Sequence, residues 1–309
     1  MITPAIAQVI DDVELNFDEG SLLLLNILIG LMMLGMALDL DVEDFKRLVR
    51  KPKPPAIGLI AQFLLLPAFT FVLTLILQPR PSIALGMILV ASCPGGNLSN
   101  VMTYLAGGNA PLSVGMTAVS TAAAIVMTPL NLAFWGNLNP DTEPILRSVS
   151  LSPLDLFMTI FVILGIPLIV GMLVAHRWPQ LAERVRKPFK IFSVVVFLGF
   201  VAVALGNNWE YFVDYVGLVV FAVLIHNALA LSLGNGAARL AGLDERDQRA
   251  VTIEVGLQNS ALALILVFDF FDGLGGMAVI AAWWGIWHII AGLGIAGFWS
   301  RRPVESAVA

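Results

Sequence analysis

The chain consists of long apolar segments separated by short polar ones. One membrane-spanning helix needs about 20 apolar residues, and most of the apolar segments reach or approach that length. We therefore predict an all-α membrane protein with nine transmembrane helices. The predicted spans cover residues 21–38, 56–77, 82–106, 110–135, 154–175, 190–206, 215–238, 250–271 and 275–299.

The composition agrees with this pattern and excludes several classes of protein. Hydrophobic residues make up 58% of the 309 residues, charged residues make up 13%, and the net charge is −5. A soluble domain carries about 25% charged residues, so neither a water-soluble enzyme nor a nucleic-acid-binding protein fits. A single cysteine, Cys93, and three histidines exclude a disulfide framework and leave little for a zinc site. We expect the lipid bilayer as a partner, with no nucleic acid, no organic cofactor and no obligate protein partner.

The basic residues indicate the orientation of the predicted helices. If nine spans alternate in direction, fifteen of the seventeen Lys and Arg residues lie on one side of the membrane, and only Arg80 and Arg147 lie on the other. The positive-inside rule then puts the acidic tail, residues 1–20, outside the cell and the tail 300–309 in the cytoplasm. We expect a multi-pass protein of the plasma membrane, which is the inner membrane in a bacterium. The basic stretch 177–189 is interpreted as a solvated loop, with a short amphipathic helix as the alternative.

Two predicted helices contain residues that interrupt a helix. The third has Pro-Gly-Gly at residues 94–96, near mid-depth, and the eighth reads EVGLQNS at residues 254–260. Proline removes a backbone donor, and one such kink on its own is compatible with simple helix packing. Two interrupted helices in corresponding places of the two halves are instead typical of an inverted-repeat secondary transporter. Spans two to four and seven to nine run in opposite directions, so we expect two crossing discontinuous helices that meet near the bilayer centre.

Glu254 is the one acidic residue that we place well inside a predicted span. A carboxylate at the bilayer centre costs on the order of 2.5 to 3.5 kcal/mol, and we find no Lys or Arg at that depth, so the expected partner is a proton or a cation. Na⁺ prefers oxygen ligands. Each hydroxyl nearby could instead bond to its own helix backbone, and Gln62 could make an ordinary interhelical hydrogen bond. The oxygen-bearing side chains in neighbouring positions are Ser99, Asn100, Ser113, Thr117, Gln258 and Gln62.

Two segments resemble the paired signatures of the bile acid:sodium symporter family. They are PGGNLSNVMTYLAGGNAPLSV, which begins at Pro94, and TIEVGLQNS, which begins at Thr252. The resemblance covers nearly the whole chain and implies two inverted repeats, a core domain and a panel domain. The core would comprise residues 56–135 and 215–299, and the panel residues 21–45 and 154–213. The first 20 residues cannot supply the extra helix of ten-helix members, so the chain resembles the bacterial nine-helix members.

The resemblance also implies binding residues for two Na⁺ ions and for the substrate. The first ion would be held by Ser99, Asn100, Ser113, Thr117 and Glu254. The second would be held by Gln62, Glu254, the backbone carbonyls of Val255 and Leu257, and Gln258. The substrate would face the backbone amides of Asn97 and Leu98, together with Asn259, Ser260 and His288. Asn97 and Ile289 differ from the residues that are common in the family at the substrate-binding wall, so the identity of the substrate stays open.

We therefore expect a secondary active transporter that couples sodium to the symport of an organic anion by alternating access. The anion would be bile-acid-like, or a small carboxylate or sulfonate. The alternative is a proton-coupled carrier or an oxyanion (arsenite-type) exporter of the same superfamily, in which Cys93 would take part. An intramembrane enzyme would need a nucleophile and base or a catalytic carboxylate pair, and the sequence contains no such arrangement. Charged rings typical of channels and a GxxxxGK phosphate loop are missing as well.

Overall fold

The structure, a computed structural model, describes residues 19–38, 48–149, 152–189 and 209–302, with a few isolated positions outside these ranges. Within them the chain forms helices and no β-strand. The helices of the first half are α2 (Glu19–Ala37), α4 (Lys53–Ile60), η1 (Ala61–Leu65), α5 (Leu66–Leu77), α6 (Pro81–Ser92), α7 (Leu98–Leu105), α8 (Ala110–Leu138) and α9 (Glu143–Ser148). Those of the second half are α10 (Pro153–Ile160), η2 (Phe161–Gly165), α11 (Ile166–Arg177), α13 (Trp209–Leu240), α14 (Glu245–Gly256), α15 (Ser260–Phe270) and α16 (Gly275–Ser300).

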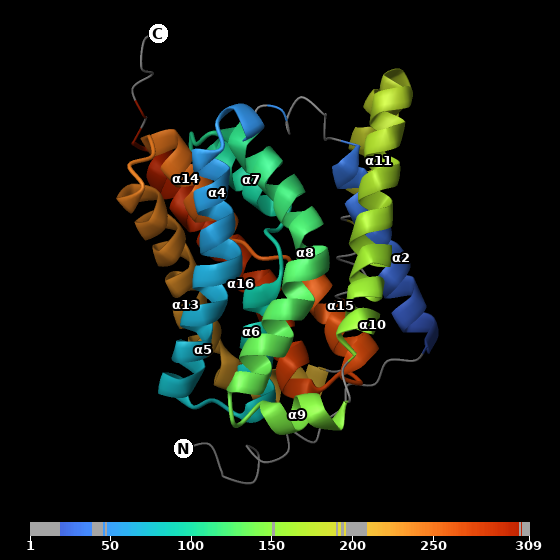
Figure 1. The fold of residues 1–309 in the computed structure, drawn as a ribbon, viewed down its shortest axis with the longest axis vertical. Helices are drawn as coiled ribbons and strands as arrows, with labels where there is room; N and C mark the ends of the chain where they lie inside the picture. The colour runs from blue at the N-terminus through green and yellow to red at the C-terminus, as the bar shows by residue number, and fades with distance from the viewer. Residues whose placement is uncertain are drawn as a thin grey trace.

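Helices occupy eight of the nine predicted spans. Helices α2 and α11 lie on one side of the bundle, and α4, α5 and α13 lie on the other (Figure 1). The sixth predicted span, 190–206, and most of the two tails lie outside the described residues. Five described helices are long and apolar enough to cross a membrane: Lys53–Leu77, Ala110–Leu138, Leu154–Arg177, Val219–Leu240 and Gly275–Ser300.

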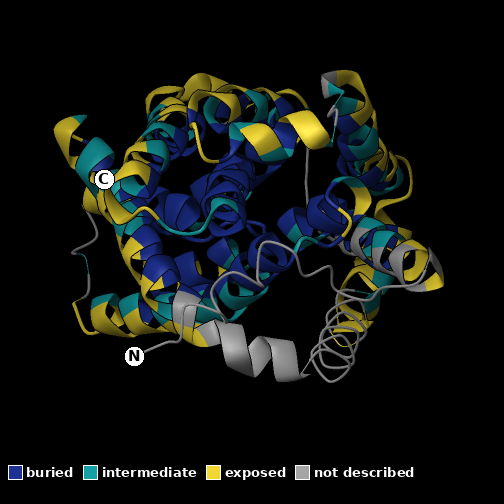
Figure 2. Cartoon of the chain, turned by 90° about the horizontal axis from the view of Figure 1, so that it is seen from below, coloured by how far each residue is buried: buried dark blue, intermediate teal, exposed yellow. Residues whose placement is uncertain are grey.

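Apolar side chains cover much of the outer surface of the bundle. Figure 2 shows the buried residues at its centre and the exposed residues around the perimeter. Leu64, Phe134 and Phe221, from three different helices, are 58%, 60% and 71% exposed. An exposed apolar surface of this extent is typical of contact with lipid or with another protein, and together with the five long apolar helices it indicates a multi-pass membrane protein.

The interpretation of residues 177–189 as a solvated loop was wrong. Helix α11 continues to Arg177, and residues 179–189 form a further helix. This segment is rich in Leu, Ala, Glu, Arg and Lys, which favour a helix. Ala182 is buried, whereas Arg184 and Lys187 are exposed. The amphipathic helix that was the alternative for this stretch is therefore the one formed.

Two long helices each contain one π-helical turn. The turns are η1, at Ala61–Leu65, and η2, at Phe161–Gly165, and each is followed two residues later by a proline, Pro67 or Pro167. Proline has no N–H and crowds the preceding turn, which explains the wider helix at this point. Single π turns are frequent at functional sites. The first one carries Gln62, which is buried.

Both predicted interruptions are present. Helix α6 ends at Ser92 and α7 begins at Leu98, with Cys93 in an extended conformation between them. Helix α14 ends at Gly256 and α15 begins at Ser260. The residues between the half-helices leave backbone groups without helical partners, and these groups organise the site.

Candidate cation site at the two helix breaks

The two interrupted helices meet at their breaks. Gly95 and Gln258 form an isolated antiparallel β-bridge. On either side of it, the N–H of Gly96 donates to the carbonyl of Leu257 at 2.6 Å, and the N–H of Asn259 donates to the carbonyl of Pro94 at 2.8 Å. Non-helical backbone at membrane depth is tolerated only where protein or water satisfies it. Here each break satisfies the other.

This close approach depends on two glycines. A Cβ atom added to Gly95 would lie 2.8 Å from Cδ of Glu254, closer than real Cβ atoms come to other heavy atoms. A Cβ added to Gly96 would lie 3.2 Å from the carbonyl oxygen of Gln258. The Pro-Gly-Gly sequence therefore ends the helix and also lets the second break come against the first.

The carboxylate of Glu254 lies directly behind this crossing and is buried, with 2% of the residue exposed. Its Oε2 accepts hydrogen bonds from Ser99 at 2.6 Å, Thr117 at 3.0 Å and Ser113 at 3.3 Å, and its Oε1 accepts one from Thr117 at 2.8 Å. Oδ1 of Asn100 lies 2.9 Å from the Ser113 hydroxyl and 3.1 Å from the Thr117 hydroxyl. The five residues predicted for the first Na⁺ are thus gathered in one cluster.

The cluster has more acceptor capacity than protons. Ser99, Ser113 and Thr117 carry one hydroxyl proton each, whereas the carboxylate has about four lone-pair sites and the Asn100 carbonyl has two. Several of the distances above are therefore alternatives for the same proton. A cation at the centre of such a cluster would use the remaining lone pairs, and oxygen is the ligand that hard cations prefer.

Three helices position these side chains. Ser99 and Asn100 stand in the first turn of α7, Ser113 and Thr117 are four residues apart in α8, and Glu254 is near the end of α14. Residues four apart lie on one face of a helix, which is why both α8 hydroxyls reach the carboxylate. Thr117 also lies 3.0 Å from the Ser113 carbonyl, so the local backbone bond competes with the site.

Three of the residues predicted for the second Na⁺, Gln62, Gln258 and Val255, are joined by hydrogen bonds. Nε2 of Gln62 donates to Oε1 of Gln258 at 2.6 Å and to the Cys93 carbonyl at 2.9 Å, and Nε2 of Gln258 donates to the Val255 carbonyl at 2.6 Å. The Leu257 carbonyl accepts from Gly96. Oε1 of Gln62 is buried and has no hydrogen-bond partner among the residues that the structure describes. An unsatisfied buried acceptor costs about 1 to 3 kcal/mol, and a bound cation would remove that cost.

Asn227 is a polar residue of this region that the sequence interpretation missed. It stands on α13 with 1% exposed, and its Nδ2 donates to the carbonyl of Gly256 at 2.7 Å. All three carbonyls at residues 255–257 therefore accept hydrogen bonds, each from a different residue. An asparagine within the apolar stretch FAVLIHNALAL was the signal that could have found it.

The predicted substrate residues come from three places: the start of α7, the start of α15 and the middle of α16. Asn97 and Leu98 are half-buried at the start of α7, and the side chain of Asn97 makes no capping hydrogen bond. Asn259 instead caps α15, because its Oδ1 accepts from the Leu262 N–H at 3.1 Å, and Ser260 follows it. His288 is buried on α16, and its Nδ1 has no hydrogen-bond partner in the described part of the chain. Among the described residues, no hydrogen bond joins His288 to the other four.

A comparison with known families identifies the chain. Residues 26–215 match the Sodium Bile acid symporter family, and these residues include the first break with Ser99, Asn100, Ser113 and Thr117. The chain belongs to this family. Members of the Sodium Bile acid symporter family are transporters, so the protein is a membrane transporter and not an enzyme.

Individual relatives in the family extend the match to the second break. An uncharacterized sodium-dependent transporter of Bacillus subtilis (strain 168), YocS, is 37% identical over 279 residues, which are 90% of this chain and 83% of that protein. The probable sodium/metabolite cotransporter BASS2, a chloroplastic protein of Oryza sativa subsp. japonica, is 33% identical and covers 90% of this chain and 64% of its own length. The human ileal sodium/bile acid cotransporter is 30% identical over 79% of this chain and 68% of its own. This chain thus spans about two thirds of the last two relatives.

Proposed function

We propose that the protein is a Na⁺-coupled symporter that carries an organic anion across the plasma membrane by alternating access. The observation that carries this proposal is the buried carboxylate of Glu254. It accepts hydrogen bonds from hydroxyl groups on α7 and α8, and no basic side chain of the described residues is paired with it. The names of the three relatives above all refer to sodium. A monovalent cation fits both the negative charge and the oxygen ligands.

Two Na⁺ ions would share Glu254. One would bind among Ser99, Asn100, Ser113 and Thr117, and the other between Gln62, Gln258 and the carbonyls of Val255 and Leu257. Two cations and one carboxylate leave a local charge near +1. A singly charged anion in front of the crossing would neutralise that charge, so binding of ions and binding of anion would favour each other. This gives the physical basis for coupling.

The anion would bind where the second half-helices begin. Helix N-termini attract anions through free N–H groups and the helix dipole, and α7 and α15 both begin at the crossing. Asn97 and Leu98 would contact the anion on one side, with Asn259 and Ser260 on the other and His288 from α16. We propose a bile-acid-like anion or a small carboxylate or sulfonate.

The topology belongs to the same proposal. Nine spans would form two inverted repeats, with residues 56–135 and 215–299 as the moving core and residues 21–45 and 154–213 as the panel. The N-terminus would lie outside the cell and the C-terminus in the cytoplasm. The meeting of the two breaks supports this arrangement, because it is the contact that a pseudo-symmetric pair of interrupted helices makes.

Cys93 bears on the alternative transport mechanism. An exporter that binds its oxyanion through this cysteine needs an accessible sulfur, whereas Cys93 is fully buried at the end of α6. Its carbonyl is used by Gln62. These contacts favour a structural role for Cys93 and support sodium coupling over the thiol-dependent exporter.

Transport by purified protein in proteoliposomes tests the proposal directly. Uptake of radiolabelled bile acid, small carboxylates and sulfonates would be measured with an inward Na⁺ gradient, with K⁺ in place of Na⁺, and with a proton gradient alone. We expect at least one anion to accumulate only with the Na⁺ gradient. Accumulation that ignores Na⁺ and follows the proton gradient would replace this proposal with the proton-coupled alternative.

Gln62→Leu should reduce the number of Na⁺ ions coupled to transport. Leucine fills a similar volume but offers no oxygen, so the second site would be lost while the Glu254 cluster stays intact. The Hill coefficient for Na⁺ activation of uptake should fall from about two toward one, since it is limited by the number of sites. Gln180→Leu, at an exposed position, is the control. A Gln62→Leu protein with an unchanged Na⁺ curve would contradict the assignment of Gln62 to a second site.

A further inference from the structure

The loop between α7 and α8 lies on the first turn of α14. This loop, residues 106–109, reads AGGN and belongs to the first sequence signature, but it supplies no ligand to the cation site. The N–H of Asn109 donates to the Arg246 carbonyl at 3.0 Å, and its Nδ2 donates to Oδ1 of Asp247 at 2.6 Å. The Ala106 carbonyl accepts from the Arg249 guanidinium at 2.6 Å.

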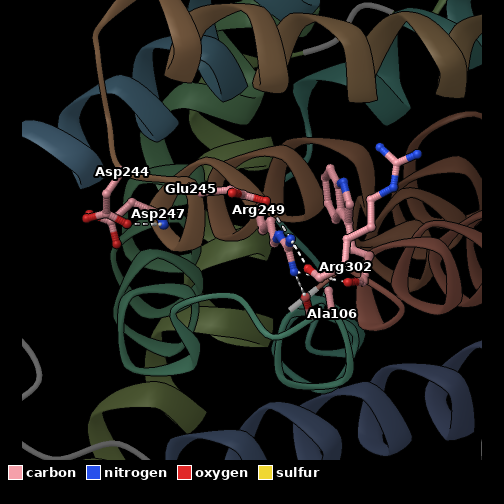
Figure 3. Close-up of polar contacts among 7 residues, drawn as sticks. Ala106, Asp244, Glu245, Asp247, Arg249 and Arg302 are labelled. Carbon is pink, nitrogen blue, oxygen red and sulfur yellow. Dashed lines mark hydrogen bonds and ion pairs between the residues drawn. The ribbon is translucent and has the colours of Figure 1, made fainter. Parts of the chain in front are cut away.

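Arg249 makes the central contacts of this region (Figure 3). Only 2% of the residue is exposed, and it lies within α14, one residue before the start of the predicted eighth span. Its Nη1 donates to the carbonyls of Ala106 and Trp299, and its Nη2 donates to Glu245 and to the Arg302 carbonyl at 2.6 Å. Ala106 follows the last residue of α7, and Trp299 and Arg302 flank the end of α16. One guanidinium thus caps two helix C-termini, where a positive charge is favoured.

We propose that Arg249 is a positioning residue for the cation site, acting together with the loop 106–109. This inference rests on the proposed sodium coupling. Glu254 follows Arg249 by five residues on α14, a distance of about 7.5 Å along a helix. Ser99 and Asn100 stand at the opposite end of α7 from Ala106. The guanidinium therefore joins the end of α7 that is remote from the ligands to α14, more than one helical turn before Glu254.

The short length of α7 and α14 explains why the two half-helices must be held together at a point away from the ligands. Helix α7 has 8 residues and α14 has 12, and helices this short are marginal without tertiary contacts. Each also has one end at a break, where the chain is unwound: α7 begins there and α14 ends there. If α7 slid or turned against α14, the Ser99 hydroxyl would leave the Glu254 carboxylate, which lies only 2.6 Å away. Fixing the register at Arg249 keeps the ligands together.

The two glycines of the loop allow it to lie close to the Arg249 side chain. Gly107 has φ +66°, a conformation that favours glycine. A Cβ added to Gly108 would lie 3.2 Å from Cβ of Arg249 and 2.9 Å from Cγ2 of Thr103. A larger residue at 108 would push the loop away from α14. Gly108→Ala is therefore an independent way to loosen the same contact without touching the guanidinium.

Thermal unfolding of the full-length protein in detergent tests this inference. NaCl would be exchanged for KCl at constant total salt, and the Na⁺ concentration that gives half of the maximal stabilisation would be recorded. A ligand that binds only the folded state raises the unfolding temperature with concentration. Arg249→Lys, Arg249→Gln and Gly108→Ala are compared with two controls: Arg246→Gln, at an exposed position on the same turn, and Gly236→Ala, where an added Cβ meets nothing within 4 Å.

We expect Arg249→Lys to raise the half-maximal Na⁺ concentration by about 10- to 100-fold, the range found for residues that orient metal ligands. Lysine keeps the charge but lacks the planar fork that reaches several carbonyls at once. Gly108→Ala should shift the concentration in the same direction, and both controls should match the unaltered protein. If Arg249→Gln does not fold, the Na⁺ dependence of Arg249→Lys and Gly108→Ala tests the inference.

Two results would overturn the inference, and they differ in what they imply for sodium coupling. If Arg249→Lys and Gly108→Ala unfold at lower temperature in KCl but keep the normal Na⁺ concentration dependence, Arg249 stabilises the fold without positioning the ligands. If the unaltered protein is stabilised equally by Na⁺ and K⁺, the proposed sodium coupling itself is wrong, and the inference fails with it.

Discussion

Replacing Glu254 with glutamine will abolish Na⁺-driven uptake. Glutamine keeps the size of the side chain and one carbonyl oxygen, but it removes the one negative charge that both proposed Na⁺ ions would share. Loss of a residue that only orients ligands costs about 10- to 100-fold in metal affinity, and loss of the shared carboxylate should exceed that. In Na⁺-free buffer the variant should unfold at the same or a higher temperature, because a buried charge without its cation destabilises the fold.

Proteoliposome uptake and thermal unfolding in Na⁺ and K⁺ measure both parts of this result. Glu143→Gln makes the same chemical change in α9, where the carboxylate forms an ion pair with the largely exposed side chain of Arg147, and it should leave transport unchanged. Glu254→Gln protein that still accumulates substrate with full Na⁺ dependence would refute the cation site. Loss of uptake together with a large loss of stability in K⁺ would instead indicate a structural role for the carboxylate.

Gly95→Ala should eliminate Na⁺-dependent uptake while lowering the stability of the fold only moderately. The added methyl group would contact the Glu254 side chain, whose Cδ lies 2.8 Å from the Cβ position. A side chain moves more easily than backbone, so Glu254 would turn away from the hydroxyls of Ser99 and Thr117. Overpacking of this kind costs about 1 to 3 kcal/mol of stability, whereas the loss of ligand geometry should remove Na⁺-dependent uptake almost completely.

Gly96→Ala is the informative comparison for Gly95→Ala. At position 96 the added atom would meet the carbonyl oxygen of Gln258 at 3.2 Å and that of Leu257 at 3.3 Å, so backbone must move and the main loss should be in the unfolding temperature. Gly236→Ala controls for the glycine substitution itself. If Gly95→Ala responds to Na⁺ as the unaltered protein does, the close contact between the first break and Glu254 has no role in ion binding.

The two breaks, and the polar side chains that lie beside them, followed from local features of the sequence. Proline and two glycines at residues 94–96 cannot continue a helix in lipid, and the polar stretch 254–260 needs partners within the protein. A carboxylate among apolar residues indicated where a cation would bind. The four-residue spacing of Ser113 and Thr117 put both hydroxyls on one face. Each of these inferences depends on residues close together in the chain or on the cost of a polar group in lipid.

The missed features depend on contacts between residues far apart in the chain. Arg249 looked like one more cytoplasmic basic residue, because only the approach of Ala106 and of the end of α16 buries it. Asn227 gained its role from the Gly256 carbonyl, which is free only because α14 ends there. Residues 179–189 were interpreted as a loop because of their three basic residues, although Ala182 packs inward.

The sequence by itself therefore determined the apolar helices, the two breaks and the carboxylate of Glu254 inside a span, since hydrophobicity, helix-breaking residues and the cost of charge in lipid act locally. Tertiary structure decided the pairing of the two breaks, the hydrogen bonds that hold each carbonyl at residues 255–257, and the burial of Arg249. Those features depend on which backbone groups a break leaves without partners and on which distant side chain comes near enough to satisfy them.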